Sequence, residues 1–262
     1  MGRIVIIILL IVGGLFAIVY LWPKFKNKST EIKYMQTKKI SELREAFNQM
    51  QQSGLEQSYR EYVELKGAAV SDQPIQTPFS NQPAVYCESK LSQVTSERER
   101  YQDSEGNWQE RTNRRENVIS DEKSSQYIYL KDSSGDEKVT IELSASGCSL
   151  DIQQTFDRFE PRNNLSNYSF FNTFSFSPYG SETLGFRMTE KVIRPNQQMY
   201  ILGEAFLSGD EIHIGTPTDH GKPFIVTTKS EDDLVNATGR NAVLALAGGI
   251  AAIVVGVLMI IF

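Results

Sequence analysis

Two cysteines and two histidines are the side chains with the clearest capacity for metal binding or nucleophilic catalysis. The sequence contains Cys87, Cys148, His213 and His220 and no others of these types. A zinc site would need all four in one place, and no CxxC or HxxxH spacing pairs them. The spacing does not indicate a nucleophilic Cys–His pair, and Gly-x-Ser-x-Gly, P-loop and dinucleotide-binding motifs are missing. We therefore predict no catalytic residue, no metal site and no bound cofactor.

The same residues have simpler structural interpretations. Cys87 and Cys148 could form one disulfide in an oxidising compartment, but two cysteines are too few for a disulfide scaffold. We favour the interpretation that both are small, half-buried residues of strands. His213 alternates with Ile212 and Ile214, which is typical of a strand residue on a polar face.

The distribution of charge excludes one class of partner and suggests another. The chain has 27 Lys and Arg against 32 Asp and Glu, so it has no overall basic field for nucleic acid. Between residues 97 and 122, acidic side chains alternate with Arg98, Arg100, Arg111, Arg114 and Arg115. On a hairpin, such mixed signs usually form cross-strand ion pairs on a solvated surface. The functional alternative is a ribbon that docks onto another protein.

Both ends of the chain are long uncharged apolar segments. Residues 242–262 number 21, and a helix of that length spans about 31 Å, which matches the hydrocarbon core of a bilayer. The segment Ile4 to Trp22 runs directly into Pro23 and lacks the cleavage site of a signal peptide. We therefore predict an N-terminal anchor over residues 1–23 and a second transmembrane helix over residues 242–262.

The lysines beside the first apolar segment predict its orientation. Six lysines and one glutamate lie between Lys24 and Lys39, whereas only Arg3 and the terminal amine lie on the other side. Arg240 precedes the second segment, and no charge follows it. The positive-inside rule therefore places the middle of the chain in the cytoplasm. The lysines could also bind anionic membrane lipid, or they could be a solvated cluster that only sets the topology.

Small residues recur every four positions in the second apolar segment, at Gly248, Ala252 and Gly256. Such a stripe lets another helix approach closely, and Gly13 and Ala17 give the first segment a shorter stripe of the same kind. We predict that the two segments pack together or pair between protomers as a homo-oligomer. The alternative is that these are ordinary small residues of an apolar helix.

Helical patterns flank the middle region. Residues 24–58 form a basic juxtamembrane segment with a predicted helix over Thr30 to Gln52, whose apolar stripe is Ile40, Leu43, Phe47 and Met50. Residues 230–241 are predicted to be a connecting helix that Ser230 caps and that is loosened at Gly239.

The middle region, residues 59–229, is predicted to be one β-rich domain of an α+β, mostly antiparallel fold. Nine short β-prone segments are separated by turn residues: 62–70, 84–99, 108–120, 126–131, 138–143, 184–193, 198–207, 211–214 and 224–228. Turns at residues 103–107 and 132–136 predict hairpins. The aromatic-rich segment 163–180 is expected to cover an edge of the core, with docking to a bilayer or a partner as the alternative.

The order of several motifs resembles a known family. They are VELKG at 63–67, QPI at 73–75, VYC at 85–87, YLKD at 129–132 and EKVIRPN at 190–196 before YILGEA at 200–205. Together with the two flanking apolar segments they resemble the GIDE domain, also called the beside-a-membrane (BAM) domain. It is the middle domain of RING-type E3 ubiquitin transferases such as the mitochondrial ubiquitin ligase activator of NF-kappa-B. The matching positions, to which we assign structure before function, are Gly67, Pro74, Glu190, Pro195, Asn196, Gly203 and Glu204.

The resemblance implies ubiquitin-protein transferase activity, but the residues of this sequence depart from it. A RING holds two tetrahedral zinc ions, which takes about eight Cys and His ligands, and this sequence has two of each. We therefore expect a non-catalytic module that holds an unidentified partner protein near the bilayer. The alternative is a protein-modification component related to E3 ubiquitin ligases. Mitochondrial relatives are thought to hold the domain in the intermembrane space, opposite to the side that the lysines indicate.

Overall fold

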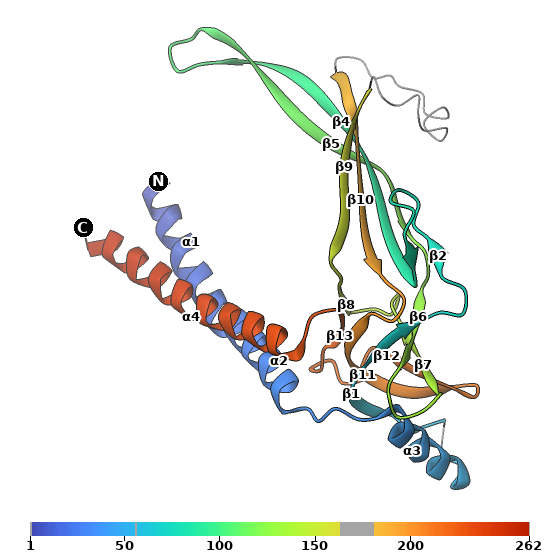
Figure 1. The fold of residues 1–262 in the computed structure, drawn as a ribbon. Helices are drawn as coiled ribbons and strands as arrows, with labels where there is room; N and C mark the ends of the chain where they lie inside the picture. Colours follow the sequence, from blue (N-terminus) through green and yellow to red (C-terminus); the bar gives the residue numbers. More distant parts are fainter. Residues whose placement is uncertain (1, 56, 163–180, 262) are drawn as a thin grey trace. The chain divides into compact units, whose positions relative to one another are not determined.

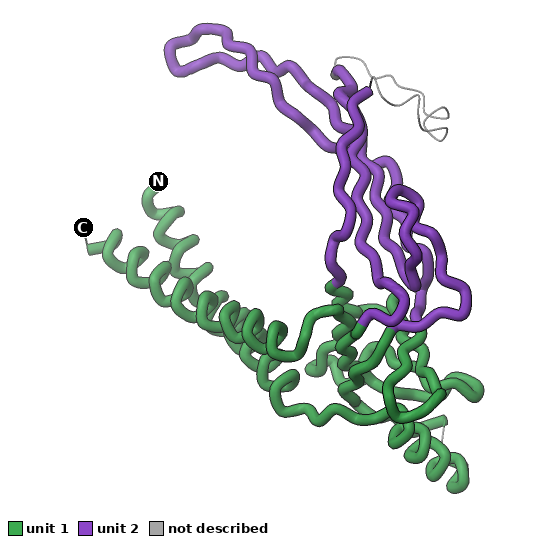
Figure 2. Tube along the Cα trace, in the orientation of Figure 1, with its two compact units in different colours: residues 1–68, 129–151, 198–262 green, residues 69–128, 152–197 purple. Residues whose placement is uncertain are grey.

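The chain folds into two compact units (Figure 2). The computed structural model describes residues 2–55, 57–162 and 181–261. Unit 1 comprises residues 1–68, 129–151 and 198–262, and unit 2 comprises residues 69–128 and 152–197. The region 59–229, for which one β-rich domain is expected, is thus shared between the two units. The aromatic-rich segment 163–180 lies outside the described residues.

The N-terminal helical segment is longer than the sequence predicts. α1 (Gly2–Phe16) continues through a π-helical turn (Ala17–Leu21) into α2 (Trp22–Tyr34). Pro23, which we expected to end the helix, instead lies in the first turn of α2. The π-helical turn directly precedes it, and proline is tolerated in the first turn of a helix because its missing N–H is not needed there.

The C-terminal helix is also continuous. α4 (Glu231–Ile261) runs through Gly239 without a break, so the expected loosening there is wrong. The hydroxyl of Ser230 accepts a hydrogen bond from the backbone N–H of Asp233 at 3.2 Å, which confirms the predicted cap. Both helical segments are long and apolar enough to cross a membrane, and few of their side chains are buried. They therefore differ from the buried core helix of a soluble protein.

The predicted helix over Thr30 to Gln52 is two helices in the structure. α2 ends at Tyr34 and α3 (Ile40–Gln52) begins six residues later, with five residues of extended chain between them. The N–H of Lys38 donates to the carbonyl of Glu64 at 2.9 Å, and this sheet contact replaces a helical one. The turn after β6 caps α3, because Asp132 accepts from the N–H of Ile40 at 2.8 Å.

Unit 1 contains a seven-stranded sheet in which five strands close into a ring. The strand order is β1-β6-β7-β12-β11-β13-β8, and β1 also pairs with β11. The pairs β7–β12 and β8–β13 are parallel. The strands are β1 (Glu61–Val70), β6 (Tyr127–Lys131), β7 (Lys138–Glu142), β8 (Cys148–Asp151), β11 (Gln198–Ser208), β12 (Glu211–Gly215) and β13 (Phe224–Thr227). Small closed sheets of this kind have interiors filled with side chains.

Unit 2 contains a four-stranded antiparallel sheet with the order β5-β4-β10-β9 and a small β2–β3 ribbon (Figure 1). The strands are β2 (Ile75–Gln76), β3 (Pro83–Ala84), β4 (Tyr86–Gln102), β5 (Trp108–Lys123), β9 (Gln154–Pro161) and β10 (Ser181–Ile193). The predicted hairpin at residues 103–107 joins β4 to β5, with Gly106 at a φ of 87°. The α+β class with mostly antiparallel strands and two flanking apolar helices is confirmed.

Candidate functional site

Glu190, one of the residues that match the family pattern, fastens a loop to the sheet of unit 2. Its side chain is fully buried on β10. It accepts hydrogen bonds from the N–H of Phe79 at 2.6 Å, from the N–H of Ser80 at 3.2 Å and from the hydroxyl of Ser80. Several donors on one carboxylate stabilise a buried charge without a counter-ion. The bonds hold Phe79 against the buried cluster of Leu91, Phe186 and Met188.

We expect Glu190→Ala to lower the free energy of unfolding by about 2 to 4 kcal/mol, because it strands buried donors of Phe79 and Ser80. Glu182→Ala is the matched control, since Glu182 is exposed on the same strand. The measurement is urea unfolding of the full chain in detergent. Equal losses in both variants would show that the loop does not depend on Glu190.

Pro195 and Asn196 form the reversal between β10 and β11. The N–H of Gln197 donates to the carbonyl of Arg194 at 3.1 Å, and Asn196 has a φ of 62°. Proline followed by a residue with positive φ is the pattern of a type II turn. The N–H of Asn196 also donates to the carbonyl of Ala69 at 2.9 Å. Both family-pattern residues therefore have structural roles in unit 2.

Gly67 and Gly203 lie where the sheet of unit 1 leaves no room for a side chain. A Cβ atom at Gly67 would lie 2.5 Å from the carbonyl oxygen of Lys131. A Cβ atom at Gly203 would lie 2.8 Å from the ring of Phe224 and 2.9 Å from the side chain of Ile214. Both glycines therefore allow close approach within the ring of strands.

The last two family-pattern residues differ in environment. Glu204 is buried in unit 1 and accepts from the N–H and hydroxyl of Thr218 at 3.1 and 2.8 Å. It therefore holds the loop after β12. Pro74 is exposed in the loop before β2, where it restricts the backbone and makes no contact that assigns it a function.

Glu64 is the centre of a polar network that the sequence patterns do not reveal. It is fully buried on β1. Its carboxylate accepts from the hydroxyl of Tyr200 at 2.8 Å and from the hydroxyl of Thr37, and it lies 3.1 Å from the ammonium of Lys66. Lys66 also donates to Glu231 of α4 at 2.6 Å. The network thus connects β1, β11, the segment before α3 and the start of α4.

An apolar cluster lies beside this network. It joins Ile32 of α2 and Leu234 of α4 to Tyr200, Leu202 and Ile225 of the sheet. All five side chains are buried. We call these residues together with Glu64, Lys66 and Glu231 the helix–sheet joint. The joint fixes the ends of both apolar helices to the sheet of unit 1.

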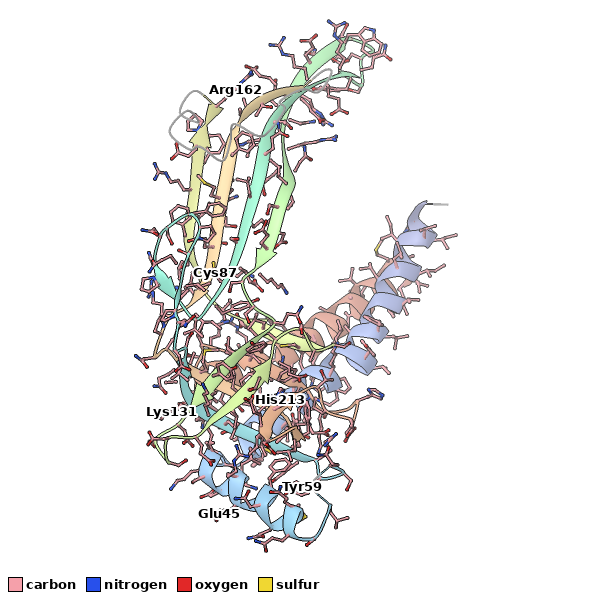
Figure 3. All side chains as sticks on the ribbon, turned by 90° about the vertical axis from the view of Figure 1, so that its right-hand side faces the viewer. Glu45, Tyr59, Cys87, Lys131, Arg162 and His213 are labelled. Atoms are coloured by element: carbon pink, nitrogen blue, oxygen red, sulfur yellow. The ribbon has the colours of Figure 1, made fainter. Side chains whose placement is uncertain are left out.

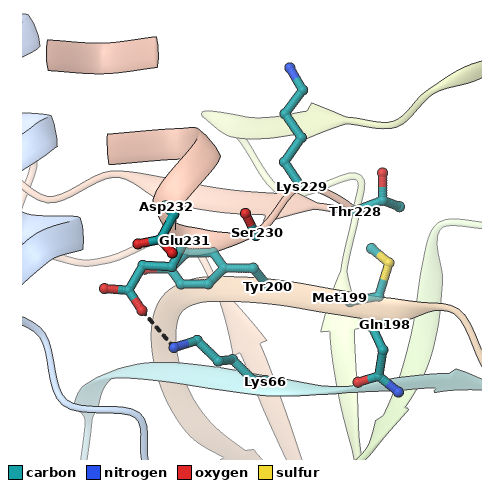
Figure 4. Close-up of a pocket in the computed structure, with 9 residues that line it drawn as sticks. All are labelled: Lys66, Gln198, Met199, Tyr200, Thr228, Lys229, Ser230, Glu231 and Asp232. Carbon is teal, nitrogen blue, oxygen red and sulfur yellow. Dashed lines mark hydrogen bonds and ion pairs between the residues drawn. The ribbon is translucent and has the colours of Figure 1, made fainter. Parts of the chain in front are cut away.

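A pocket of about 410 Å³ opens at the helix–sheet joint (Figure 4). Burial and the hydrogen bond to Glu64 raise the pKa of Tyr200. Burial alone would lower the pKa of Lys66, but its hydrogen bonds to Glu231 and Glu64 outweigh burial and raise it. At neutral pH, Tyr200 is therefore neutral and Lys66 charged, and neither is a nucleophile. The remaining lining residues are Gln198, Met199, Thr228, Lys229, Ser230 and Asp232.

The cysteines and histidines do not assemble into a site in the part of the chain that the structure describes. Cys87 is buried on β4 of unit 2, and His213 lies on β12 of unit 1 (Figure 3). Cys148 lies on β8 of unit 1, and neither cysteine forms a disulfide. His213 lies 3.0 Å from a carboxylate oxygen of Glu142. Among the described residues, no three His, Cys, Asp or Glu side chains are grouped as a metal site requires.

The thiol of Cys87 is expected to be almost unreactive in the folded protein. Burial, together with the charges of Glu190 and Glu88, raises its pKa to about 12. At pH 8 the thiolate is therefore about a thousandfold scarcer than for an ordinary thiol, and labelling slows in proportion. Maleimide labelling of a Cys148→Ser variant measures this rate, with 6 M guanidinium chloride as the control. Rapid labelling of the folded variant would contradict the burial.

The raised pKa of Cys87 also makes the stability depend on pH. Because the pKa of Cys87 is higher in the folded protein than in the unfolded chain, the free energy of unfolding falls as the pH rises from about 9 to about 12.

The two apolar helices pack against each other through Gly256, which was predicted, and through Gly14 and Gly249, each one position from a predicted glycine. A Cβ atom at Gly249 would lie 2.9 Å from the carbonyl oxygen of Gly14, and one at Gly256 would lie 2.9 Å from Ile11. Gly248 and Gly13, in contrast, have open space around them. Of the predicted stripe, Gly256 contacts the first helix within the chain and Gly248 does not, while Ala252 is only partly buried. The small residues at the contact are Gly14, Ala17, Gly249 and Gly256.

The hairpin of β4 and β5 presents two different faces. Among the described residues, β10 pairs with β4 only as far as Glu97, and beyond that point β4 and β5 pair only with each other, as a two-stranded ribbon. The register places even-numbered residues of both strands on one face and odd-numbered ones on the other. The odd face carries the ion pairs Arg111–Glu99 and Arg115–Glu97. The even face carries Arg98, Arg100, Trp108, Glu110 and Arg114.

The even face differs from the odd face in its exposed tryptophan and in its charges. Trp108 is 71% exposed. The acids of this face are Glu110 and Glu116, beside Arg98, Arg100 and Arg114. Glu110 pairs with Arg100 at 2.6 Å, and Glu116 pairs with Arg187 of β10 at 3.5 Å. Among the described residues, Arg98 and Arg114 therefore have no carboxylate partner. We call this face, with Arg98, Arg100, Trp108 and Arg114, the basic ribbon face.

These features define a class of protein: a β-rich module attached to two helices that are long and apolar enough to cross a membrane. The comparison with protein families matches residues 96–261 to GIDE, described as E3 ubiquitin ligase. The match covers more than half of the chain, so the chain belongs to the GIDE family. No curated protein and no solved structure matches it. Five family-pattern residues lie inside the matched range, whereas Gly67 and Pro74 precede it.

Proposed function

We propose that this protein is a non-catalytic, membrane-anchored module that binds an acidic surface of a partner protein through its basic ribbon face. Both apolar helices cross the bilayer, and the helix–sheet joint attaches the β structure to them. Trp108 on the ribbon is the observation that carries the proposal, because a large exposed aromatic beside arginines is typical of a binding hot spot.

The charges support an acidic partner. The odd face of the ribbon has cancelling ion pairs, which gain little from a charged partner. The even face has surplus arginines, and Arg98 has no ion pair among the described residues. Complementary charge speeds association and selects partners. Binding is therefore expected to weaken as salt rises.

Photo-crosslinking in native membranes tests this face. A photo-crosslinking amino acid at Thr112 lies on the even face, and the same amino acid at Asn113 lies on the odd face. We expect one defined product from position 112 that is lost in Arg98→Gln and at high salt. Equal products from both positions, or none from position 112, would refute the proposed face.

A cytoplasmic location of the β units is part of the proposal, and the six lysines from Lys24 to Lys39 support it. Glu105 at the hairpin tip is exposed, so Glu105→Cys in a Cys87→Ser, Cys148→Ser background is a suitable probe. We expect a membrane-impermeant maleimide to label it only after the membrane is permeabilised. Labelling in intact cells would place the units outside.

The family description favours a second candidate, a component of ubiquitin-type protein modification. Reconstitution of the full chain with ubiquitin-activating and ubiquitin-conjugating enzymes distinguishes the two. The binding module transfers no ubiquitin by itself and holds no zinc. Transfer accompanied by about two zinc ions per chain would favour a RING-type activity instead.

A further inference from the structure

A groove of about 470 Å³ lies between α2 and α4 of unit 1. On the α2 side, the groove is lined by Trp22, Lys26, Ser29 and Thr30. On the α4 side, it is lined by small and apolar residues between Gly239 and Ile250. Gly239 of α4 lies opposite Ser29 of α2, because a Cβ atom at Gly239 would be 3.9 Å from the hydroxyl of Ser29.

The groove changes from polar to apolar along its length. The two helices run antiparallel, because Ser29 contacts Val235 while Arg3 donates to the carbonyl of Met259. Ser29 and Thr30 therefore lie at the end nearest the sheet, and Ile250 lies at the end inside the apolar segment. A ligand that follows the groove would need a polar head and an apolar tail.

The polar end of the groove is positively charged. The ammonium of Lys26 lies 4.9 Å from the centre of the Trp22 ring. The residues described as lining the groove include no carboxylate. Lys24, Lys28 and Lys33 belong to the same helix, in which Glu31 is the only acid. α4 begins with Glu231, Asp232 and Asp233, and none of these lines the groove. The site therefore favours an anionic head group.

We propose that this groove binds one anionic phospholipid, with its phosphate at Lys26 and an acyl chain along Leu246, Ala247 and Ile250. The membrane supplies such a molecule at this depth, because aromatic and lysine side chains mark the interface between head groups and hydrocarbon. The exposed apolar residue Val243 makes the groove open to lipid along α4. The proposal rests on both helices crossing the membrane and is independent of the ribbon face.

Trp22 provides the measurement, because the chain has two tryptophans and Trp108→Phe leaves Trp22 as the only one. The full chain is reconstituted into phosphatidylcholine vesicles that contain a small fraction of brominated phosphatidylglycerol or of brominated phosphatidylcholine. Bromine quenches the fluorescence of a nearby indole. The fluorescence of each variant is compared with that of the same variant in vesicles without brominated lipid. We expect about fivefold enrichment of the anionic lipid next to Trp22, as one lysine near the surface provides.

Two matched pairs separate a groove from general attraction by the lysines. Lys26→Gln is expected to abolish the preference and Lys33→Gln to preserve it, although both remove one charge from α2. Ala247→Phe fills the groove and is expected to reduce quenching, whereas Ala251→Phe, one turn further at an exposed position, is not. If Lys26→Gln and Lys33→Gln reduced the preference for the anionic lipid equally, the preference would come from general electrostatic attraction and not from the groove. Quenching in neither lipid would instead show that Trp22 lies outside the bilayer.

Discussion

Glu64→Ala is expected to lower the free energy of unfolding by about 3 to 5 kcal/mol. The substitution leaves the hydroxyl of Tyr200 without its buried acceptor. It also removes one of the two carboxylate partners of Lys66, the other being Glu231 of α4. A buried hydroxyl left without its acceptor costs about 1 to 3 kcal/mol, and the cavity left by the fully buried Glu64 side chain adds to that cost. Lys66 adds little, because its side chain is 41% exposed and keeps Glu231 as a partner. Thermal unfolding of the full chain in detergent measures the effect.

The matched control for this substitution is Glu61→Ala. Glu61 lies on the same strand and pairs with Lys38 at 2.6 Å, but its side chain is 27% exposed. A partly exposed pair of this kind contributes about 1 kcal/mol or less. If the two variants lost the same stability, the network at Glu64 would be no more important than a surface ion pair.

Gly249→Leu is expected to separate the two apolar helices, whereas Gly248→Leu is expected to leave them together. A leucine at position 249 collides with the backbone of Gly14 and with Ile18. Overpacking of this kind costs about 1 to 3 kcal/mol. A leucine at position 248 meets open space, although its volume and hydrophobicity are the same.

A disulfide between the helices reports their contact. A Cβ atom at Gly256 would lie 3.5 Å from the Cβ atom of Leu10, a separation suited to a disulfide. In a Cys87→Ser, Cys148→Ser background, the pair Leu10→Cys and Gly256→Cys is expected to crosslink within one chain. Adding Gly249→Leu should lower the yield at least fivefold, and adding Gly248→Leu should not. Equal yields, or products that are only dimeric, would contradict packing of the two helices within one chain.

The sequence predicted strands well where period and turn residues agree. Each of the nine predicted segments corresponds to a strand, within a few residues at each end. β8 and β9 were missed because both are irregular, and β9 contains Asp157, Arg158 and Glu160 among its aromatic residues. β8 is four residues long and depends on its parallel neighbour β13. Its pairing is decided by long-range contacts that a local pattern does not contain.

The break between α2 and α3 illustrates the same limit. The residues from Met35 to Lys39 contain neither glycine nor proline, so local propensity favours a continuous helix. The structure instead pairs Thr37 with Glu64 of β1. Tertiary hydrogen bonds therefore outweigh propensity at this position.

Glu64 shows why the helix–sheet joint was not predicted as a site. In an antiparallel strand with one solvated face, a glutamate between Val63 and Leu65 is assigned to that face. In β1 all three residues are buried, because the strand belongs to a closed ring and lies beside the helix ends. A buried carboxylate at the centre of a network that joins four segments is visible only once the segments are assembled.

The sequence predicted that small residues line the contact between the two helices, but it did not predict which of two adjacent glycines lies at the contact. Spacing of four residues selected Gly248, whereas the contact with α1 uses Gly249 and Gly256, which are seven residues apart. Two adjacent glycines at 248 and 249 make the two registers equally compatible with the sequence. The neighbouring helix decides between them.

Extraction of membranes with alkaline carbonate tests the central claim most directly, because it removes proteins that are held only by surface contacts. We propose that lipid surrounds the exposed apolar side chains of α1 and α4, which are long and apolar enough to cross a membrane. Burial in lipid does not depend on pH. We predict that the full chain stays in the membrane pellet after the carbonate wash and enters the supernatant only with detergent. Release of the intact chain by carbonate alone would contradict two membrane-spanning helices and, with them, the proposed anchor.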